Sequence, residues 1–243
     1  MDRMVKRRRI AVVPARGGSK RLPQKNIMNF FGKPMIAWTI EAAIEAKLFD
    51  RIIVSTEDND IARIGSEYGA DVPFRRELYF DDDAPVSAAT IHAITQAKLH
   101  LGEEYEEVCQ LMPNCPLRNA DDVRVAHTAF ETRRADFQIS CTSFGWPNPW
   151  WALTLDGDGN GERLFPSAIE RRSQDLPRLF CPTGAIWIAR VPKLMSSGSF
   201  YGPEHRFEPM SWISAVDIDD QEDLIFARAA YMVRNNLEKS GRP

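Results

Sequence analysis

Residues 9–26 read RIAVVPARGGSKRLPQKN, a short β-branched run that continues directly into a glycine-rich, basic segment. The apolar part predicts a buried strand, and the glycines and cations after it predict a loop at the strand's carboxyl end. A second run, RIIVS at 51–55, follows a segment at 35–47 with the apolar spacing of a helix. Strand, helix and strand in this order form a βαβ unit. The fold therefore begins with two parallel strands.

The same alternation continues through most of the chain. We expect further helices at 58–68, 87–101, 121–133 and 221–235, and further strands at 108–112, 137–142, 185–189 and 212–216. This order predicts an α/β fold: a three-layer, Rossmann-like, mainly parallel sheet with helices on both faces. The rhythm breaks at about 144–182, where tryptophans and prolines lead into the turn DGDGNG. We interpret this stretch as a hairpin and arm inserted into a single domain of residues 1–243.

Composition limits the function classes. The 243 residues are 44% hydrophobic, and no stretch approaches the length of a membrane span or of a secretion signal. The four cysteines, Cys109, Cys115, Cys141 and Cys181, show no CxxC pairing, which favours a cytoplasmic location. A net charge of −3 argues against bulk nucleic-acid binding, yet residues 1–33 hold ten lysines or arginines and one acid. This local excess of positive charge favours an anionic ligand.

The basic loop carries groups that suit phosphate. Gly17 and Gly18 can bring backbone N–H groups close to phosphate oxygens, while Arg16, Lys20 and Lys25 can neutralise a polyanion. The loop is neither a P-loop nor a dinucleotide fingerprint, because GxxxxGK[ST] and GxGxxG are both absent. The alternative is an ordinary basic loop between a strand and a helix.

Two other segments should face the same edge of the sheet. PNCPLR at 113–118 is a proline-bracketed loop that we expect to present backbone amides and Arg118 toward a cleft. Asp217 and Asp219 lie two residues apart, so continued strand geometry would place both carboxylates on one face, where they could hold Mg²⁺ with phosphate oxygens. Alternatively these acids cap the last helix, a role that Asp220 suits better.

Further signatures lie along the chain in a fixed order. They are FDRIIVST (49–56), PNCPLR (113–118), RRSQDLP (171–177), PTGAIWI (182–188) and VDID (216–219). With the opening ARxGSKxxxxKN, they resemble the cytidylyltransferases that activate sialic acid and related nonulosonic acids, over nearly the whole chain. The resemblance implies transfer of a cytidylyl group from CTP to an acidic 2-keto-3-deoxy sugar, with release of pyrophosphate, in a homodimer that uses Mg²⁺.

The resemblance also implies roles for single residues. Arg16 and Lys25 match the cations that bind the triphosphate, and we expect them to be the catalytic residues. Asp217 and Asp219 match the metal ligands. The expected nucleotide contacts are Ala15, Arg16, Gly17, Gly18, Ser19, Lys25, Asn26, Arg75 and Pro113. Arg76 is an alternative to Arg75, and both could instead be solvated. No unambiguous general base appears.

The sequence departs from the family's pattern on the sugar side. Met112 stands where a sugar-contacting glutamine is usual, and Trp187 stands where the family commonly has tyrosine. Methionine cannot donate the hydrogen bonds of an amide, and tryptophan offers more apolar surface with one donor. We expect Met112, Arg172, Gln174 and Trp187 to meet a nonulosonic acid other than plain sialic acid, such as a legionaminic or pseudaminic acid. Arg172 and Gln174 could equally serve a subunit interface.

Three alternatives stay open at this point. The chain could be a cytidylyltransferase for the eight-carbon sugar Kdo, or a related enzyme that uses another nucleotide. It could be a nucleotide-binding regulator that has lost turnover. It could also be a nucleic-acid-binding module that uses the basic N-terminus, which would show a steep dependence of affinity on salt.

Overall fold

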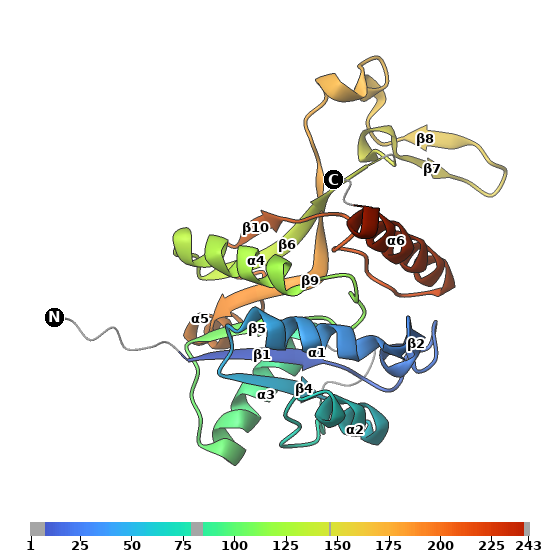
Figure 1. Cartoon of the computed structure of the whole chain (residues 1–243). Coiled ribbons are helices and arrows are strands. Elements are labelled where there is room, and N and C mark those ends of the chain that lie inside the picture. The colour runs from blue at the N-terminus through green and yellow to red at the C-terminus, as the bar shows by residue number, and fades with distance from the viewer. Residues whose placement is uncertain (1–7, 79–84, 146, 241–243) are drawn as a thin grey trace.

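The computed structural model describes residues 8–78, 85–145 and 147–240, and it is built around one six-stranded sheet (Figure 1). The strand order is β10-β6-β9-β5-β1-β4. Strand β1 pairs in parallel with β4 and β5, β10 pairs in parallel with β6, and β9 runs antiparallel to both β5 and β6. The bounds are β1 Arg9–Pro14, β4 Arg51–Ser55, β5 Glu107–Gln110, β6 Phe137–Ser143, β9 Phe180–Arg190 and β10 Arg206–Pro209. The expected mainly parallel sheet is confirmed.

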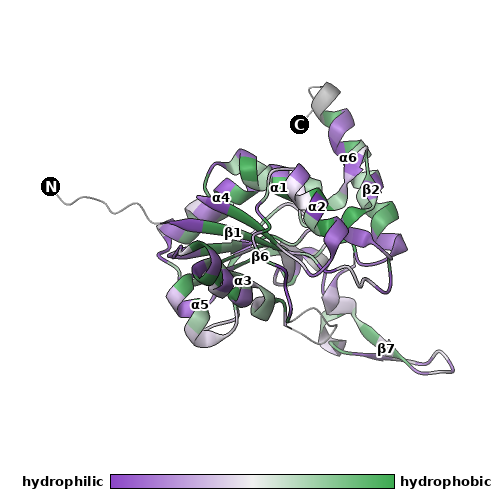
Figure 2. Ribbon diagram, turned by 90° about the horizontal axis from the view of Figure 1, so that it is seen from below, coloured by the Kyte–Doolittle hydropathy of each residue, from purple (hydrophilic) through white to green (hydrophobic). Residues whose placement is uncertain are grey.

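Helices cover both faces of the sheet, as the alternation in the sequence predicts. They are α1 Met35–Ala46, α2 Asn59–Glu67, α3 Val86–Leu101, α4 Ala120–Thr132, α5 Val191–Ser197 and α6 Gln221–Ser240. Ala11 and Val13 of β1 pack with α1 and α4 on one face, whereas Ile10 and Val12 pack with α3 on the other. All four side chains are fully buried because β1 is an interior strand, and apolar strands appear at the centre of Figure 2.

One expected strand is wrong. Residues 212–215 form a turn, in which the Ala215 N–H donates to the Ser211 carbonyl at 2.9 Å. The sheet edge is filled instead by β10, which the alternation did not predict. Ile213, Val216 and Ile218 are apolar because they pack against α6. An apolar run of this length cannot by itself distinguish a strand from a loop packed under a helix.

The inserted segment leaves the sheet between β6 and β9. We call residues 147–179 the arm, and Figure 1 shows it standing away from the sheet and its helices. Its hairpin pairs β7 (Leu153–Leu155) with β8 (Gly161–Arg163), and Asp156 closes the turn by accepting from the Asp158 and Asn160 amides. DGDGNG is therefore a hairpin turn. The arm also holds the 3-10 turns η2 Pro149–Trp151, η3 Pro166–Ala168 and η4 Ser173–Asp175.

Two smaller elements follow the basic loop. The 3-10 turn η1 (Lys25–Ile27) leads into a two-stranded ribbon, β2 (Asn29–Phe30) and β3 (Lys33–Pro34), before α1 begins. Phe30 of this ribbon is fully buried and packs with Tyr231 of α6. In the parts of the chain that the structure covers, no helix is both long and apolar enough to cross a membrane.

Candidate active site

A pocket opens at the carboxyl ends of β1 and β5, the edge at which open α/β sheets bind ligands. The basic loop after β1 forms one wall, the segment after β5 forms another, and Asp219 joins them from the start of α6. The residues that line the pocket are Pro14, Arg16, Ser19, Lys20, Arg21, Leu22, Lys25, Asn26, Arg76, Val86, Ala89, Met112, Pro113, Asn114 and Asp219. Most of the expected nucleotide contacts therefore share one cavity with one of the expected metal ligands.

Two cations of the basic loop hold Asp219. The Lys25 ammonium group donates to Asp219 Oδ1 at 2.8 Å, and Arg21 Nη2 donates to Asp219 Oδ2 at 2.8 Å. Burial alone would raise the pKa of Asp219, but the hydrogen bond and charge of Lys25 outweigh it and lower that pKa. Asp219 is thus a carboxylate whose charge is balanced by the loop that we expect to bind phosphate.

Asp217 lies next to Asp219 in a different environment. Asn114 Nδ2 donates to Asp217 Oδ1, and it lies 3.3 Å from Asp219 Oδ1. Loss of hydration around its carboxyl group raises the pKa of Asp217 to about 6, and the negative charge of Asp219 adds to the effect. The buried Ile218 between them points away, so both carboxylates lie on one side although this segment is not a strand.

The donor set around the two aspartates fits a hard cation. Asp217 and Asp219 offer carboxylate oxygens, and the buried Asn114 Oδ1 accepts no hydrogen bond from the described residues. Oxygen ligands of this kind are what Mg²⁺ prefers. Asp219 Oδ1 accepts from Lys25 and Oδ2 accepts from Arg21, so a bound cation would share these oxygens with the two basic side chains. Asp220 takes the helix-capping role instead, because its Oδ1 accepts from the Glu222 amide at 2.9 Å.

The glycine loop is fixed from outside the pocket. The Gly17 amide, which we expected to face phosphate, donates to Glu57 Oε1 at 2.7 Å. A Cβ atom at Gly17 would lie 2.5 Å from Asp58 Oδ2, whereas one at Gly18 would meet no described atom within 4 Å. Asn26 Nδ2 donates to the Arg16 carbonyl at 2.9 Å, and this hydrogen bond joins the two ends of the loop.

Of the two neighbouring arginines, Arg76 lines the pocket and Arg75 does not. Arg75 is exposed and donates to Asn59 Oδ1 at 3.3 Å, while the Arg76 side chain is 3% exposed and its Nη2 donates to Glu57 Oε2 at 3.0 Å. The geometry therefore favours the alternative residue over the expected nucleotide contact. Ala15, another expected contact, is fully buried, and its amide donates to the carbonyl of Ser55 in β4 at 3.0 Å.

The expectation for Arg118 is wrong. Arg118 is 2% exposed and lies beneath the loop rather than in the cleft. Its Nη1 donates to the Met112 carbonyl at 3.2 Å and to the Ala185 carbonyl at 2.7 Å. The guanidinium group faces inward, where it supplies donors to these two carbonyls, one just after β5 and one within β9. Arg118 thus connects two strands at the edge of the pocket.

The expected sugar-binding residues are not brought together within the described chain. Met112 lines the pocket, next to Pro113. Trp187 donates to the Thr183 carbonyl at 2.6 Å and packs on Phe200, away from the pocket lining. Arg172 and Gln174 are exposed on the arm, and their contact with a sugar stays a prediction.

Comparisons with known proteins agree with this geometry. Residues 10–112 match the family model described as cytidylyltransferase. Over 226 residues the chain is 30% identical to the pseudaminic acid cytidylyltransferase of Campylobacter jejuni, covering 93% of this chain and 97% of that protein. The chain belongs to the cytidylyltransferase family. This cytidylyltransferase is also 32% identical to the CMP-N,N'-diacetyllegionaminic acid synthase of Legionella pneumophila, over 88% of this chain and 92% of that one.

A solved structure shows the same fold at lower identity. CMP:2-keto-3-deoxy-manno-octonic acid synthetase, determined in complex with CTP, superposes with a TM-score of 0.68 at 17% identity. The match covers 94% of this cytidylyltransferase and 99% of the other chain. The predicted fold class, family resemblance and assignment as a nucleotidyltransferase enzyme are therefore confirmed.

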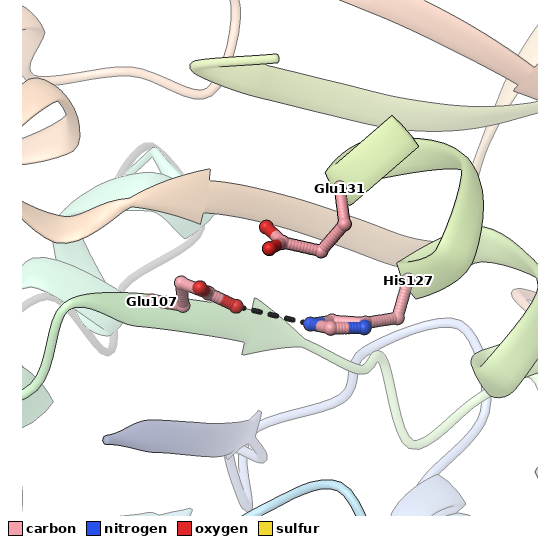
Figure 3. A group of neighbouring side chains, drawn as sticks. All are labelled: Glu107, His127 and Glu131. Atoms are coloured by element: carbon pink, nitrogen blue, oxygen red, sulfur yellow. Dashed lines mark hydrogen bonds and ion pairs between the residues drawn. The ribbon is translucent and has the colours of Figure 1, made fainter. Parts of the chain in front are cut away.

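A second group of ionisable side chains of this cytidylyltransferase, drawn in Figure 3, lies at the amino end of β5, whereas the pocket lies beyond its carboxyl end. Glu107, His127 and Glu131 each place one oxygen or nitrogen within 4.8 Å of the others. The carboxylates already have partners: Arg9 and the His127 ring donate to Glu107 Oε2 at 3.0 Å, and Arg190 donates to both glutamates. A divalent ion would have to displace the half-buried guanidinium groups of Arg9 and Arg190, so we interpret the group as an ion-pair cluster that joins β1, β5, β9 and α4.

Proposed function

We propose that this cytidylyltransferase transfers a cytidylyl group from CTP to the anomeric hydroxyl of a nonulosonic acid. The hydroxyl loses its proton to solvent as its oxygen attacks the α-phosphorus, the bond from that phosphorus to the oxygen bridging the α- and β-phosphates breaks, and pyrophosphate leaves with that oxygen. The observation that carries the proposal is the pocket in which the basic loop faces Asp219 at the carboxyl edge of the sheet. Relatives named for pseudaminic and diacetyllegionaminic acids, each aligned over most of the chain, support the acceptor class.

The reaction asks the protein mainly for alignment and for neutralisation of charge. Arg16 and Lys25, both in the pocket lining, would bind the triphosphate, and Ser19 and Asn26 would shape the loop around it. Mg²⁺ held by Asp217 and Asp219 would supply positive charge next to the phosphates. Lys25 donates to Asp219, so this one ammonium group lies between the expected metal ligands and the phosphate loop.

Met112 supports an acceptor other than plain sialic acid. Met112 lines the pocket, and its sulfur accepts a weak contact from Gln110 Nε2 at 3.9 Å. A thioether offers an apolar, polarisable surface where an amide would offer donors. We propose a deoxy, diacetamido nonulosonic acid of the pseudaminic or legionaminic type as the substrate.

We also propose that the chain is one catalytic domain that acts as a homodimer through its arm. The arm carries large apolar side chains that are exposed over much of their surface. They include Trp151, Leu153, Leu155, Leu164, Phe165 and Ile169, each at least 40% exposed. Clustered exposed apolar groups are typical of interfaces. Light scattering coupled to size exclusion tests this, because a monomer mass at micromolar concentration would contradict it.

A cytoplasmic location is part of the same proposal. All four cysteines are free, and three of them are buried, which suits a reducing compartment.

Pyrophosphate release provides the test of function. Purified protein with Mg²⁺ is mixed with each of the four ribonucleoside triphosphates and with N-acetylneuraminic, legionaminic, pseudaminic or Kdo acid. We expect release with CTP and a diacetamido nonulosonic acid. Equal efficiency with N-acetylneuraminate would contradict the interpretation of Met112, and release with Kdo alone would replace the acceptor class. No release in any combination would refute the proposed reaction.

A further inference from the structure

Glu57 connects two parts of the pocket without lining it. It follows β4, and its two carboxylate oxygens have different partners. Oε1 accepts from the Gly17 amide at 2.7 Å, and Oε2 accepts from Arg76 Nη2 at 3.0 Å. One side chain thus joins the glycine loop after β1 to the buried arginine that lines the pocket.

Arg76 depends on this contact. Its side chain is 3% exposed, and its Nε finds no hydrogen-bond acceptor among the described residues. A buried guanidinium group without a counter-charge is strongly destabilised, and it moves toward water if its partner is removed. The Arg76 amide is fixed separately by the Thr56 carbonyl at 2.9 Å, so loss of Glu57 would free the side chain while the backbone stays in place.

The same Glu57 side chain also holds Gly17, through its backbone amide. Gly17 precedes Gly18 and Ser19, and Ser19 lines the pocket. A Cβ atom here would lie 2.5 Å from Asp58 Oδ2, so any larger residue would have to displace the Asp58 side chain. The Glu57 contact therefore sets the direction in which the following residues of the loop enter the pocket.

We propose that Glu57 is a positioning residue for the nucleotide, which fixes the glycine loop and the Arg76 guanidinium group in one arrangement before the triphosphate binds. The inference rests on the proposed function of the pocket. Glu57 acts through Gly17 and Arg76, and it touches neither the acceptor nor the expected metal ligands. Its loss should therefore weaken binding of the nucleotide selectively.

The experiment compares Glu57→Gln with Glu67→Gln. Glu67 lies on the adjacent α2 in an exposed ion pair with Arg63, so it controls for loss of one negative charge in the same region. Losing a charge-assisted hydrogen bond should raise the KM for CTP about tenfold in Glu57→Gln, with kcat and the acceptor KM changed less than about twofold. Glu67→Gln should match the unchanged protein. An unaltered CTP KM in Glu57→Gln, or an equal change in both KM values, would overturn the proposal.

A double-mutant cycle identifies the route of the effect. If Glu57 acts through Arg76, the CTP KM of Arg76→Met, which removes the charge that pairs with Glu57, should change less than about threefold when Glu57→Gln is added. Fully additive changes would overturn this route. If Glu57→Gln does not fold, Glu57→Asp takes its place, since it keeps the charge but cannot reach both partners. Its CTP KM should rise severalfold, and an unchanged value would count against the proposal.

Calorimetric titration of CTP separates this inference from the proposed reaction. If the unchanged protein binds CTP but releases no pyrophosphate, the proposed reaction fails while the Glu57 variants still report nucleotide affinity. A tenfold weaker CTP affinity in Glu57→Gln supports the inference in that case, and an equal affinity refutes it.

Discussion

Protonation of Glu107 should make the fold lose stability steeply below about pH 4.5. The buried carboxylate faces Arg9 from β1, His127 and Glu131 from α4, and Arg190 from β9. Burial alone would raise the pKa of Glu107, but the hydrogen bond from His127 and the charge of Arg190 outweigh it and hold the pKa at about 2. Its ordinary value is 4.5.

The sign follows from proton linkage. Between pH 4.5 and 2 the unfolded chain binds a proton at Glu107 and the folded chain does not, so falling pH favours the unfolded state. The stabilisation is fully present above pH 4.5 and is lost as the pH approaches 2. Each pKa unit corresponds to about 1.4 kcal/mol, so the total contribution of this carboxyl is about 3 kcal/mol.

Urea unfolding of the unchanged protein and of Glu107→Gln between pH 7 and 3 provides the assay. The variant should be less stable by about 3 kcal/mol at pH 7, because it leaves Arg9 and Arg190 facing a neutral group. The difference between the two proteins should shrink steadily below pH 4.5. Glu162→Gln, in the exposed hairpin of the arm, should follow the unchanged protein at every pH. A difference that stays constant from pH 5 to 3 would refute the reasoning.

Substitutions in the pocket make three further predictions. Gly17→Ala should lower the free energy of unfolding by about 1 kcal/mol, because its Cβ would push Asp58 away from the start of α2, which it caps. Gly18→Ala should leave the free energy of unfolding unchanged, and equal melting temperatures of the two variants would contradict this prediction. Lys25→Ala should lower kcat at least about 100-fold at an unchanged melting temperature, and full activity in the pyrophosphate assay would exclude Lys25 from the site. Asp219→Asn should raise the Mg²⁺ concentration for half-maximal rate at least about tenfold, and an unaltered metal requirement would favour a purely structural role.

The layers of the fold could be predicted because burial on both faces leaves a strong local pattern. Every residue from Ile10 to Val13 is apolar, and the helices repeat their apolar faces between such runs. The side-by-side placement of Asp217 and Asp219 was also predictable, although the expected strand is wrong. Alternation persists there because Ile218 is anchored in the core and its amide donates to the Asn114 carbonyl at 2.9 Å.

The remaining errors concern contacts between distant segments. Arg118 was expected in the cleft, and nothing near it in sequence shows that its side chain donates to the carbonyl of Ala185. The sequence held a signal for the choice between Arg75 and Arg76. Phe74 is an apolar residue that is buried in the core, and in an extended segment the side chain two residues later, Arg76, points to the same side. Glu57 follows a strand at the ligand-binding edge of the sheet, and this position in the sequence already indicated a residue near the pocket.

Strand β9 gives the arm an unusual mechanical attachment. It runs for 11 residues from the exposed Phe180 at the base of the arm to Arg190 in the ion-pair cluster. At Gly184 it passes so close to the pocket that a Cβ atom there would lie 3.1 Å from Met112 Cγ and 3.3 Å from Asp217 Oδ2. Because β9 is bonded to β5 and β6 on its two sides, a pull along the strand loads those hydrogen bonds together in shear, rather than peeling them apart one by one. A force on the arm is therefore resisted by the hydrogen bonds of β9 at the centre of the sheet, and it reaches the rim of the pocket at Gly184 before the strand can slip.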